Sequence, residues 1–227
     1  GRYLVFTEST ALKDGRPSGE VRIVARDLVS GEIRDLGLAP LAPDGTFEPT
    51  GGLAVARYSH RVNLVDAGNS NEQAIVQIDI DKGTRRRIEL SEKLNHIYQV
   101  GFDATERYIY SPWRKEKGAM QGTMPVMDWL AMMAAQPGAQ EMVRIHLDTG
   151  KVEPVFNTSV WLMGHPNPHP SLPNLFMCCQ EYYGENSGSK WGRCAEHQRI
   201  RVIDLENGKW MQEKYPKLPW NGSYHEH

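Results

Sequence analysis

The chain of 227 residues carries 26 basic and 28 acidic side chains, for a formal net charge of −2, and 40% of its residues are hydrophobic. This composition is ordinary for a globular protein, and the near-neutral charge argues against a dedicated nucleic-acid binder, which usually has a basic face. The longest apolar-rich stretch, residues 124–135, is interrupted by Asp128 and is shorter than the ~20 residues that span a bilayer. We therefore expect neither a nucleic acid nor a membrane as a partner.

The predicted secondary structure is almost entirely β. Short runs rich in Val, Ile and Tyr alternate with turn residues, as at 21–25 and 74–78. A more specific signal is a hairpin turn that contains Asp, a short linker and Gly, with the Gly where the turn requires a positive φ. This turn occurs four times, at residues 27–31, 79–83, 146–150 and 204–208.

The spacing of these turns predicts a β-propeller. Their glycines are 52, 67 and 58 residues apart, and a hairpin repeated every 40–50 residues or so, with insertions, is typical of propeller blades. We expect the turn to join the second and third strands of each blade. Residues 1–227 are then part of a single all-β propeller domain, with four blades and part of a fifth from Trp220 onward. An open arc would expose two sheet edges, so we expect further blades outside this sequence to close the ring.

The longest interruption between hairpins, residues 115–140, has a different composition. Its Ala, Leu and Met residues favour helix, Pro125 suits a first helical turn, and Pro137 and Gly138 would end the helix. We predict a short helical insertion between blades, with its methionines packed on the core.

The candidate binding residues lie in the last third of the chain. His165 and His225 are 60 residues apart, about one blade, and each precedes an expected innermost strand. Equivalent positions of neighbouring blades lie side by side at the mouth of the central channel, so both histidines could face one ligand. The alternative is that each is an ordinary turn histidine.

Each of the other candidate residues also has both a functional and a purely structural interpretation. Arg199 begins a strand beside an aromatic-rich loop, and could bind a ligand or form a structural ion pair. His225 and His227 would share one face of a strand and could both bind a metal, or they could lie at a surface strand end. The remaining histidines considered have no supporting context and are expected to be exposed; they are His60, His146 and His169.

Cysteine usage gives a prediction about the compartment. Cys178, Cys179 and Cys194 are an odd number and form neither a disulfide framework nor a metal knuckle. This favours a reducing environment, and we predict a cytoplasmic protein. The chain opens directly on a strand-like segment, and both ends are interpreted as cuts through a longer protein, so a signal-peptide argument adds little.

An ordered series of motifs in this last third resembles the oligogalacturonate lyases, which are seven-bladed propellers that cleave pectin-derived oligogalacturonides. The resemblance covers about a hundred residues, and the rest of the chain agrees only as generic blades. The motifs that carry it are WLMGHP at 161–166, CQE at 179–181, QRI at 198–200, the turn at 204–208, and HE at 225–226.

The resemblance implies roles for four residues. His225 corresponds to the catalytic base of the family, Arg199 to the arginine that supports the reacting uronate, and His165 to a histidine that contacts substrate at the channel mouth. Gln180 is assigned to substrate binding by its place in the same motif series. The family uses manganese, and its ligands appear to lie beyond His227, so no metal ligand is assigned here.

Three differences from the family fall on the expected binding face. The family has His-Glu-Gly where this chain has Gln180 and Glu181 followed by two inserted tyrosines, it has an aromatic residue at the position of His227, and its loop corresponding to 182–197 is shorter. We therefore predict a lyase that acts by metal-assisted β-elimination on a small acidic oligosaccharide. The sequence does not indicate which uronic acid, whether action is exo or endo, or the oligomeric state.

Two other functions remain open from the sequence. A propeller can bind a glycan or a peptide without catalysis, since this fold hosts many functions. It can also serve a hydrolase or peptidase whose catalytic domain lies elsewhere, because no GxSxG motif occurs in these residues.

Overall fold

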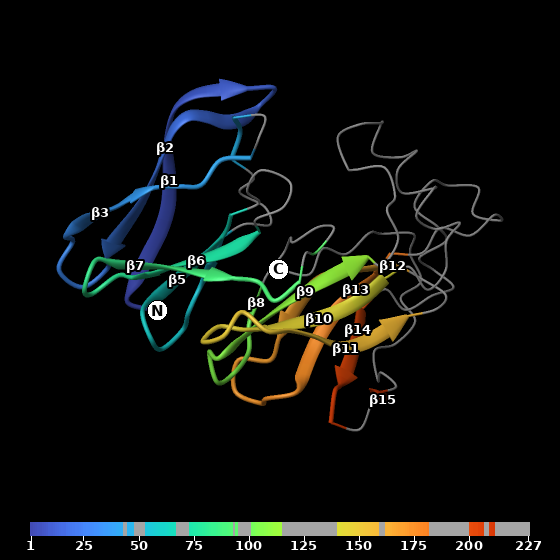
Figure 1. The fold of residues 1–227 in the computed structure, drawn as a ribbon. Coiled ribbons are helices and arrows are strands. Elements are labelled where there is room, and N and C mark those ends of the chain that lie inside the picture. Colours follow the sequence, from blue (N-terminus) through green and yellow to red (C-terminus); the bar gives the residue numbers. More distant parts are fainter. Residues whose placement is uncertain are drawn as a thin grey trace, which may run out of the picture.

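The computed structural model describes residues 1–42, 45–47, 53–66, 73–92, 94, 101–114, 140–158, 162–181, 200–206 and 209–211. Over these ranges all regular secondary structure is β, arranged in four antiparallel sheets that follow one another in chain order (Figure 1). Within the described part of the chain there is no helix long and apolar enough to cross a membrane. The helix predicted at 115–140 lies almost wholly outside the described residues, except that Gln140 begins a strand.

Each sheet is a simple meander in which consecutive strands pair. The first sheet has three strands: β1 (Tyr3–Lys13), β2 (Arg16–Asp27) and β3 (Ile33–Leu38). The second has four: β4 (Leu53–Val55), β5 (Arg61–Asp66), β6 (Ala74–Asp79) and β7 (Thr84–Glu89).

The third and fourth sheets repeat the four-stranded pattern. The third consists of β8 (Gly101–Phe102), β9 (Tyr108–Arg114), β10 (Gln140–His146) and β11 (Val152–Thr158). The fourth consists of β12 (Leu162–Pro168), β13 (Leu175–Glu181), β14 (Ile200–Asp204) and β15 (Lys209–Met211). The first strands of neighbouring sheets lie together, β4 against β8 and β8 against β12. This is the arrangement of a β-propeller, in which first strands surround the central axis.

Three of the four predicted glycine turns, at Gly31, Gly83 and Gly150, lie within the described residues and are present. The amide of Gly31 donates to the carbonyl of Asp27 at 2.8 Å, and Gly31 has φ of +79°. The amide of Gly83 donates in the same way to Asp79, also at 2.8 Å. The first side chain of each turn also accepts a backbone N–H from within it, as Asp27 Oδ1 does from Val29. Because these hydrogen bonds join residues of the turn itself, the turns could be predicted from the local sequence.

The turn does not join the second and third strands of each four-stranded sheet, as the sequence analysis expected. It joins the third and fourth: β6 to β7, β10 to β11, and β14 to β15. The first strands of the second and third sheets were missed because they are short, with three residues in β4 and two in β8.

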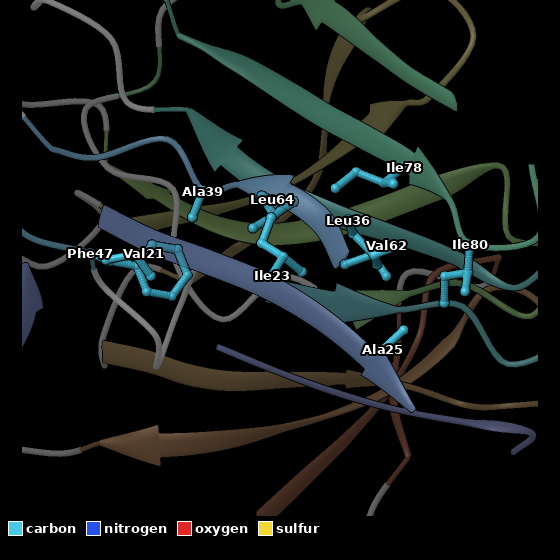
Figure 2. Close-up of a cluster of buried hydrophobic side chains, with 10 residues drawn as sticks. All are labelled: Val21, Ile23, Ala25, Leu36, Ala39, Phe47, Val62, Leu64, Ile78 and Ile80. Atoms are coloured by element: carbon cyan, nitrogen blue, oxygen red, sulfur yellow. The ribbon is translucent and has the colours of Figure 1, made fainter. Parts of the chain in front are cut away.

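Apolar clusters fill the space between consecutive sheets. The first and second sheets enclose a cluster whose members are all buried (Figure 2): Val21, Ile23, Ala25, Leu36, Ala39, Phe47, Val62, Leu64, Ile78 and Ile80. A second cluster joins the second and third sheets through residues such as Ile75, Ile109 and Ile145. A third joins the third and fourth sheets through residues such as Met142 and Phe176. Strand alternation places these side chains on opposite faces of each sheet, so every inner sheet packs on both neighbours.

Glycine is required at position 150 by close packing as well as by its φ of +70°. A Cβ at this position would lie 1.7 Å from the carbonyl oxygen of Glu89, at the end of β7. The amide of Ser91 donates to the carbonyl of Gly150 at 2.9 Å, and the Ser91 hydroxyl accepts the amide of Val152 at 2.9 Å. The turn of the third sheet is therefore locked onto the outermost strand of the second.

Candidate functional site

The fourth sheet holds the predicted site residues that the structure describes. His165 lies within β12 and Gln180 lies within β13. Arg199 and His225 lie outside the described residues, as does His227. The expectation that His165 precedes the innermost strand is wrong, because the residue belongs to that strand.

The register of β12 and β13 brings the backbone positions of His165 and Gln180 near one another. Met163 pairs with Gln180 and Gly164 pairs with Cys179, after which the register shifts before Asn167 pairs with Met177. Two residues of β12, His165 and Pro166, therefore oppose one residue of β13, which is a β-bulge. Pro166 has no N–H to donate, so the bulge lies where the ladder of hydrogen bonds between β12 and β13 is already interrupted.

The third strand of the sheet begins at the same end. Ile200, which directly follows Arg199 in the sequence, pairs with Cys179, the neighbour of Gln180. The motif positions of β12, β13 and β14 thus gather at one end of the fourth sheet. The first strand of this sheet, β12, also lies against β8 and β9 of the third sheet.

The opposite end of the sheets carries a side-chain cluster that the sequence analysis missed. The Asp81 carboxylate accepts a hydrogen bond from the Tyr3 hydroxyl at 2.6 Å, and its other oxygen lies 2.8 Å from His60 Nδ1. These hydrogen bonds, that from Tyr3 first and that with His60 second, hold the pKa of Asp81 below its usual range. The same bond with Asp81 raises the pKa of Tyr3. The cluster joins β1 of the first sheet to two turns of the second.

The sequence offered no supporting context for His60, His146 or His169, but the side chain of each forms a hydrogen bond in the structure. His60 belongs to the cluster just described, and its side chain is 28% exposed. His146 Nδ1 accepts the amide of Asp148 at 3.1 Å, so that it takes the place of aspartate in the glycine turn. His169 Nδ1 accepts the amides of Ser171 and Leu172 in the turn between β12 and β13. All three act in turns, and a signal for His146 was available, because it occupies the Asp position of the repeat.

A second missed feature is a buried carboxylate between the second and third sheets. Glu106, 5% exposed, accepts the amides of Tyr58 and Ser59 from the turn after β4. Burial favours the neutral acid, but the hydrogen bonds from Ser59 and Tyr58 prevail and lower the pKa of Glu106. Arg61 adds a hydrogen bond to the Glu106 carbonyl at 3.1 Å. Because the partners are more than forty residues away in sequence, no local pattern marks them.

The described residues include His, Cys, Asp and Glu side chains, which are the usual ligands of a metal ion. Over those ranges no group of three or more His, Cys, Asp or Glu side chains could hold a metal ion. The described part of the chain therefore offers no donor set that fits manganese.

Comparison with known proteins gives the fold. No protein-family model matches the sequence, and no curated protein matches it. Among solved structures, an oligogalacturonate lyase in complex with manganese matches with a TM-score of 0.60 at 13% identity, over 93% of this chain and 49% of that one. The chain thus spans about half of the length of that lyase.

Two peptidases match over a similar part of this chain. An acylaminoacyl peptidase of Pyrococcus horikoshii has a TM-score of 0.52 at 9% identity, over 94% of this chain and 31% of that one. The tricorn protease has a TM-score of 0.51 at 13% identity, over 90% and 22%. At such identities the likeness shows a shared β-propeller fold and does not choose between lyase and peptidase.

Proposed function

We propose that this chain is part of a propeller enzyme that cleaves a uronic-acid-containing oligosaccharide by β-elimination at the end of the fourth sheet. The observation that carries the proposal is the convergence there of three motif positions. His165 and Gln180 lie on the two innermost strands of this sheet, and β14 begins beside them immediately after Arg199.

The chemistry needs a base and a counter-charge. β-Elimination removes the weakly acidic proton beside the uronate carboxylate and breaks the bond to the 4-linked substituent. The carboxylate charge must be offset first, and a guanidinium suits this because it binds a carboxylate with two parallel hydrogen bonds. A neutral imidazole, with an unperturbed pKa near ~6.5, can accept the proton at neutral pH.

The residues are assigned on these grounds. His225 is the proposed base, Arg199 the group that binds the uronate carboxylate, and His165 and Gln180 the groups that orient the sugar. The bulge at His165 supports its part, because an extra residue in a strand re-aims a side chain beside a site.

The proposed mechanism assigns no step to manganese. The matched lyase holds manganese, but the described residues of this chain supply no donor cluster for it. We therefore derive no step through a metal. Assays with and without Mn²⁺, and after chelation, measure whether the chain depends on one.

The test is the appearance of the conjugated, unsaturated product, followed by its ultraviolet absorbance with oligogalacturonate as substrate. We expect His225→Ala to abolish turnover, Arg199→Lys to reduce it severely because an ammonium makes no bidentate contact, and His165→Ala to weaken substrate binding. The matched control is His146→Asp, which restores the Asp of the other turns at the far end of its sheet. Full activity of His225→Ala, with an unchanged circular dichroism spectrum, would refute the assignment.

A second candidate is the propeller of a peptidase, and the likeness to the two peptidases favours it. It predicts no ultraviolet product with any uronide, and peptide hydrolysis only by a longer polypeptide that includes a catalytic domain. Binding of an oligosaccharide or a peptide with neither activity would instead indicate a non-catalytic propeller.

A further inference from the structure

Three turns lie next to one another at one end of the sheets. They join the first strand to the second in the second, third and fourth sheets, at residues 56–60, 103–107 and 169–174. Because β8 contacts both β4 and β12, these turns are neighbours around the central axis. They lie at the end opposite the motif positions, since β13 begins beside its turn at Leu175 and reaches Gln180 at the other end.

Equivalent positions of the three turns expose their side chains. The turns can be compared because the residue that follows each of them pairs with the first residue of a glycine turn; these residues are Arg61, Tyr108 and Leu175. Three positions earlier lie Tyr58, Thr105 and Leu172. Tyr58 is 60% and Leu172 is 52% exposed, and Thr105 is also exposed. Two of these three positions therefore present a large apolar or aromatic side chain to solvent.

The backbone that carries Tyr58 is held from the third sheet. The buried Glu106 carboxylate accepts the amide of Tyr58 at 2.5 Å and that of Ser59 at 2.9 Å. Arg61 donates from Nε to the Ser59 hydroxyl at 2.7 Å and from Nη2 to the Glu106 carbonyl at 3.1 Å. Hydrogen bonds to a charged group are the stronger ones, so the turn is ordered before anything binds it. A preorganised surface loses less entropy on association.

The exposed charge of the first two turns is positive. Arg57 and Arg107 are exposed, and the guanidinium of Arg57 lies 5.3 Å from the centroid of the Tyr58 ring. The two carboxylates of the same turns, Asp103 and Glu106, are 6% and 5% exposed and accept backbone amides. The inner turns therefore present arginine to solvent, although the chain as a whole has a formal net charge of −2.

We propose that these turns form a docking surface for an acidic peptide segment of a partner protein. Tyr58 and Leu172 contact the apolar side chains of the segment, and Arg57 and Arg107 pair with its carboxylates. Tyrosine and arginine are among the residues that contribute most to protein interfaces, and opposite charge steers the partner to the surface. The inference does not depend on the proposed function, because the motif positions lie at the other end of the sheets.

A peptide fits this surface better than a nucleic acid does. A phosphate backbone would use the arginines but would leave the exposed side chain of Leu172 without an apolar partner. The positive area is also small, because Asp148, 58% exposed, lies in the turn between the two outer strands of the third sheet. A segment of a few residues can occupy the inner turns alone, and its carboxylates then avoid Asp148.

The test is selection from a library of short random peptides displayed on phage, with the 227-residue chain as the target. We expect the enriched peptides to combine Asp or Glu with an aromatic or aliphatic residue. Fluorescence anisotropy of the synthesised peptides should show a dissociation constant that is roughly tenfold or more higher in Tyr58→Ala and in Arg57→Gln than in the wild type. The dissociation constant should also rise with salt concentration, because ion pairs at a surface are screened.

Matched controls lie on the first sheet, away from these turns. Leu12→Ala removes an apolar side chain that is 71% exposed, and Arg22→Gln removes an arginine whose side chain is 48% exposed. Both variants should bind the peptides as the wild type does. The proposal is overturned if the enriched peptides lack acidic residues, if the library yields no binder, or if Tyr58→Ala and Arg57→Gln bind as tightly as the wild type.

Nuclear magnetic resonance locates the bound peptide on the chain. We expect the amide signals of Tyr58, Thr105 and Leu172 to shift when the peptide is added, while those of His165 and Gln180 stay in place. Shifts confined to the last two residues would mean that the peptide binds at the motif end, and would refute the docking surface.

Glu106→Gln tests whether the surface depends on the held turn. The variant keeps Tyr58 and Arg57, but an amide group cannot accept both turn amides, so the dissociation constant should rise roughly threefold or more. Glu92→Gln, on the exposed surface, should leave it unchanged, and circular dichroism checks that every variant is folded. Unchanged binding by Glu106→Gln would contradict the preorganised surface.

Discussion

Two interfaces of this propeller have the same architecture and different chemistry. The interface of the first and second sheets is filled by apolar side chains such as Ile23 and Ile78, which are both fully buried (Figure 2). The interface of the second and third sheets combines an apolar cluster with the buried polar residues Asn63, Gln77 and Glu106. The same repeat therefore accommodates either an apolar filling or one that includes buried polar side chains, most of whose polar atoms are hydrogen-bonded.

The polar groups at the second interface pair with one another. Gln77 donates to Asn63 at 3.0 Å and accepts from Arg86 Nε at 2.9 Å. Within the described residues, Asn63 Nδ2 is the one buried side-chain polar atom found without a partner. Buried hydrogen bonds of this kind are directional, whereas the hydrogen bond of Tyr3 with Asp81 that joins the first and second sheets is exposed.

The largest expected effect tests the apolar interface. Ile78→Ala should lower the free energy of unfolding by about 2–5 kcal/mol, because it removes buried methyl groups and leaves a cavity. Chemical denaturation of the wild type and the variant measures this loss of free energy of unfolding. The exposed Val55→Ala serves as the control, and an equal loss there would show that the interface is not the source of the stability.

The next effect compares two equivalent turns. Gly150→Ala should cost about 3 kcal/mol or more, since its Cβ would collide with the Glu89 carbonyl and its φ is +70°. Gly83→Ala has a similar φ of +66° and open space around the Cβ, so about 1 kcal/mol is expected. Thermal and urea unfolding of the pair should separate packing from backbone strain, and equal losses would contradict the locked turn.

A carboxylate substitution tests the polar interface. Glu106→Gln should cost about 1–3 kcal/mol, because an amide group cannot accept both the Tyr58 and Ser59 amides as the carboxylate does. The control is Glu92→Gln on the exposed surface. Hydrogen exchange at Tyr58 and Ser59 should speed up in Glu106→Gln alone; unchanged exchange would indicate that water replaces the carboxylate.

A smaller effect should appear as pH falls. Hydrogen bonds from Arg2 and then from the Val29 amide hold the pKa of Asp27 well below its usual range. A depressed folded-state pKa contributes stability above the unfolded value of about 3.9, and this contribution is lost as pH falls through the folded value. We expect urea stability to decline below about pH 4, and less steeply in Asp27→Asn. Asp14→Asn, in the exposed β1–β2 turn, should follow the wild-type profile.

The smallest expected effect lies outside both interfaces. Arg22 forms ion pairs with Asp35 and Glu20, but the side chains of Arg22 and Asp35 are 48% and 51% exposed. Arg22→Ala should therefore change the free energy of unfolding by less than about 0.5 kcal/mol. A loss above 1 kcal/mol or so in urea titration would mean that this surface contributes more than its exposure implies.

Sequence reasoning predicted the fold through its turns and misplaced what the turns connect. The glycine turns at Gly31, Gly83 and Gly150 are confirmed because each is specified by residues a few positions apart. The strands β4 and β8 were missed because two or three residues carry no measurable alternation. The roles of His165, Gln180, Arg199 and His225 remain predictions, and the manganese ligands remain unassigned.

The sequence by itself determined the class of fold, because turn chemistry and strand alternation are local and repeat at the spacing of blades. Only the tertiary structure decided the partners of Glu106 and the contact of His60 with Asp81. Those features join segments far apart in the chain, where neither residue signals the other and only packing brings them together.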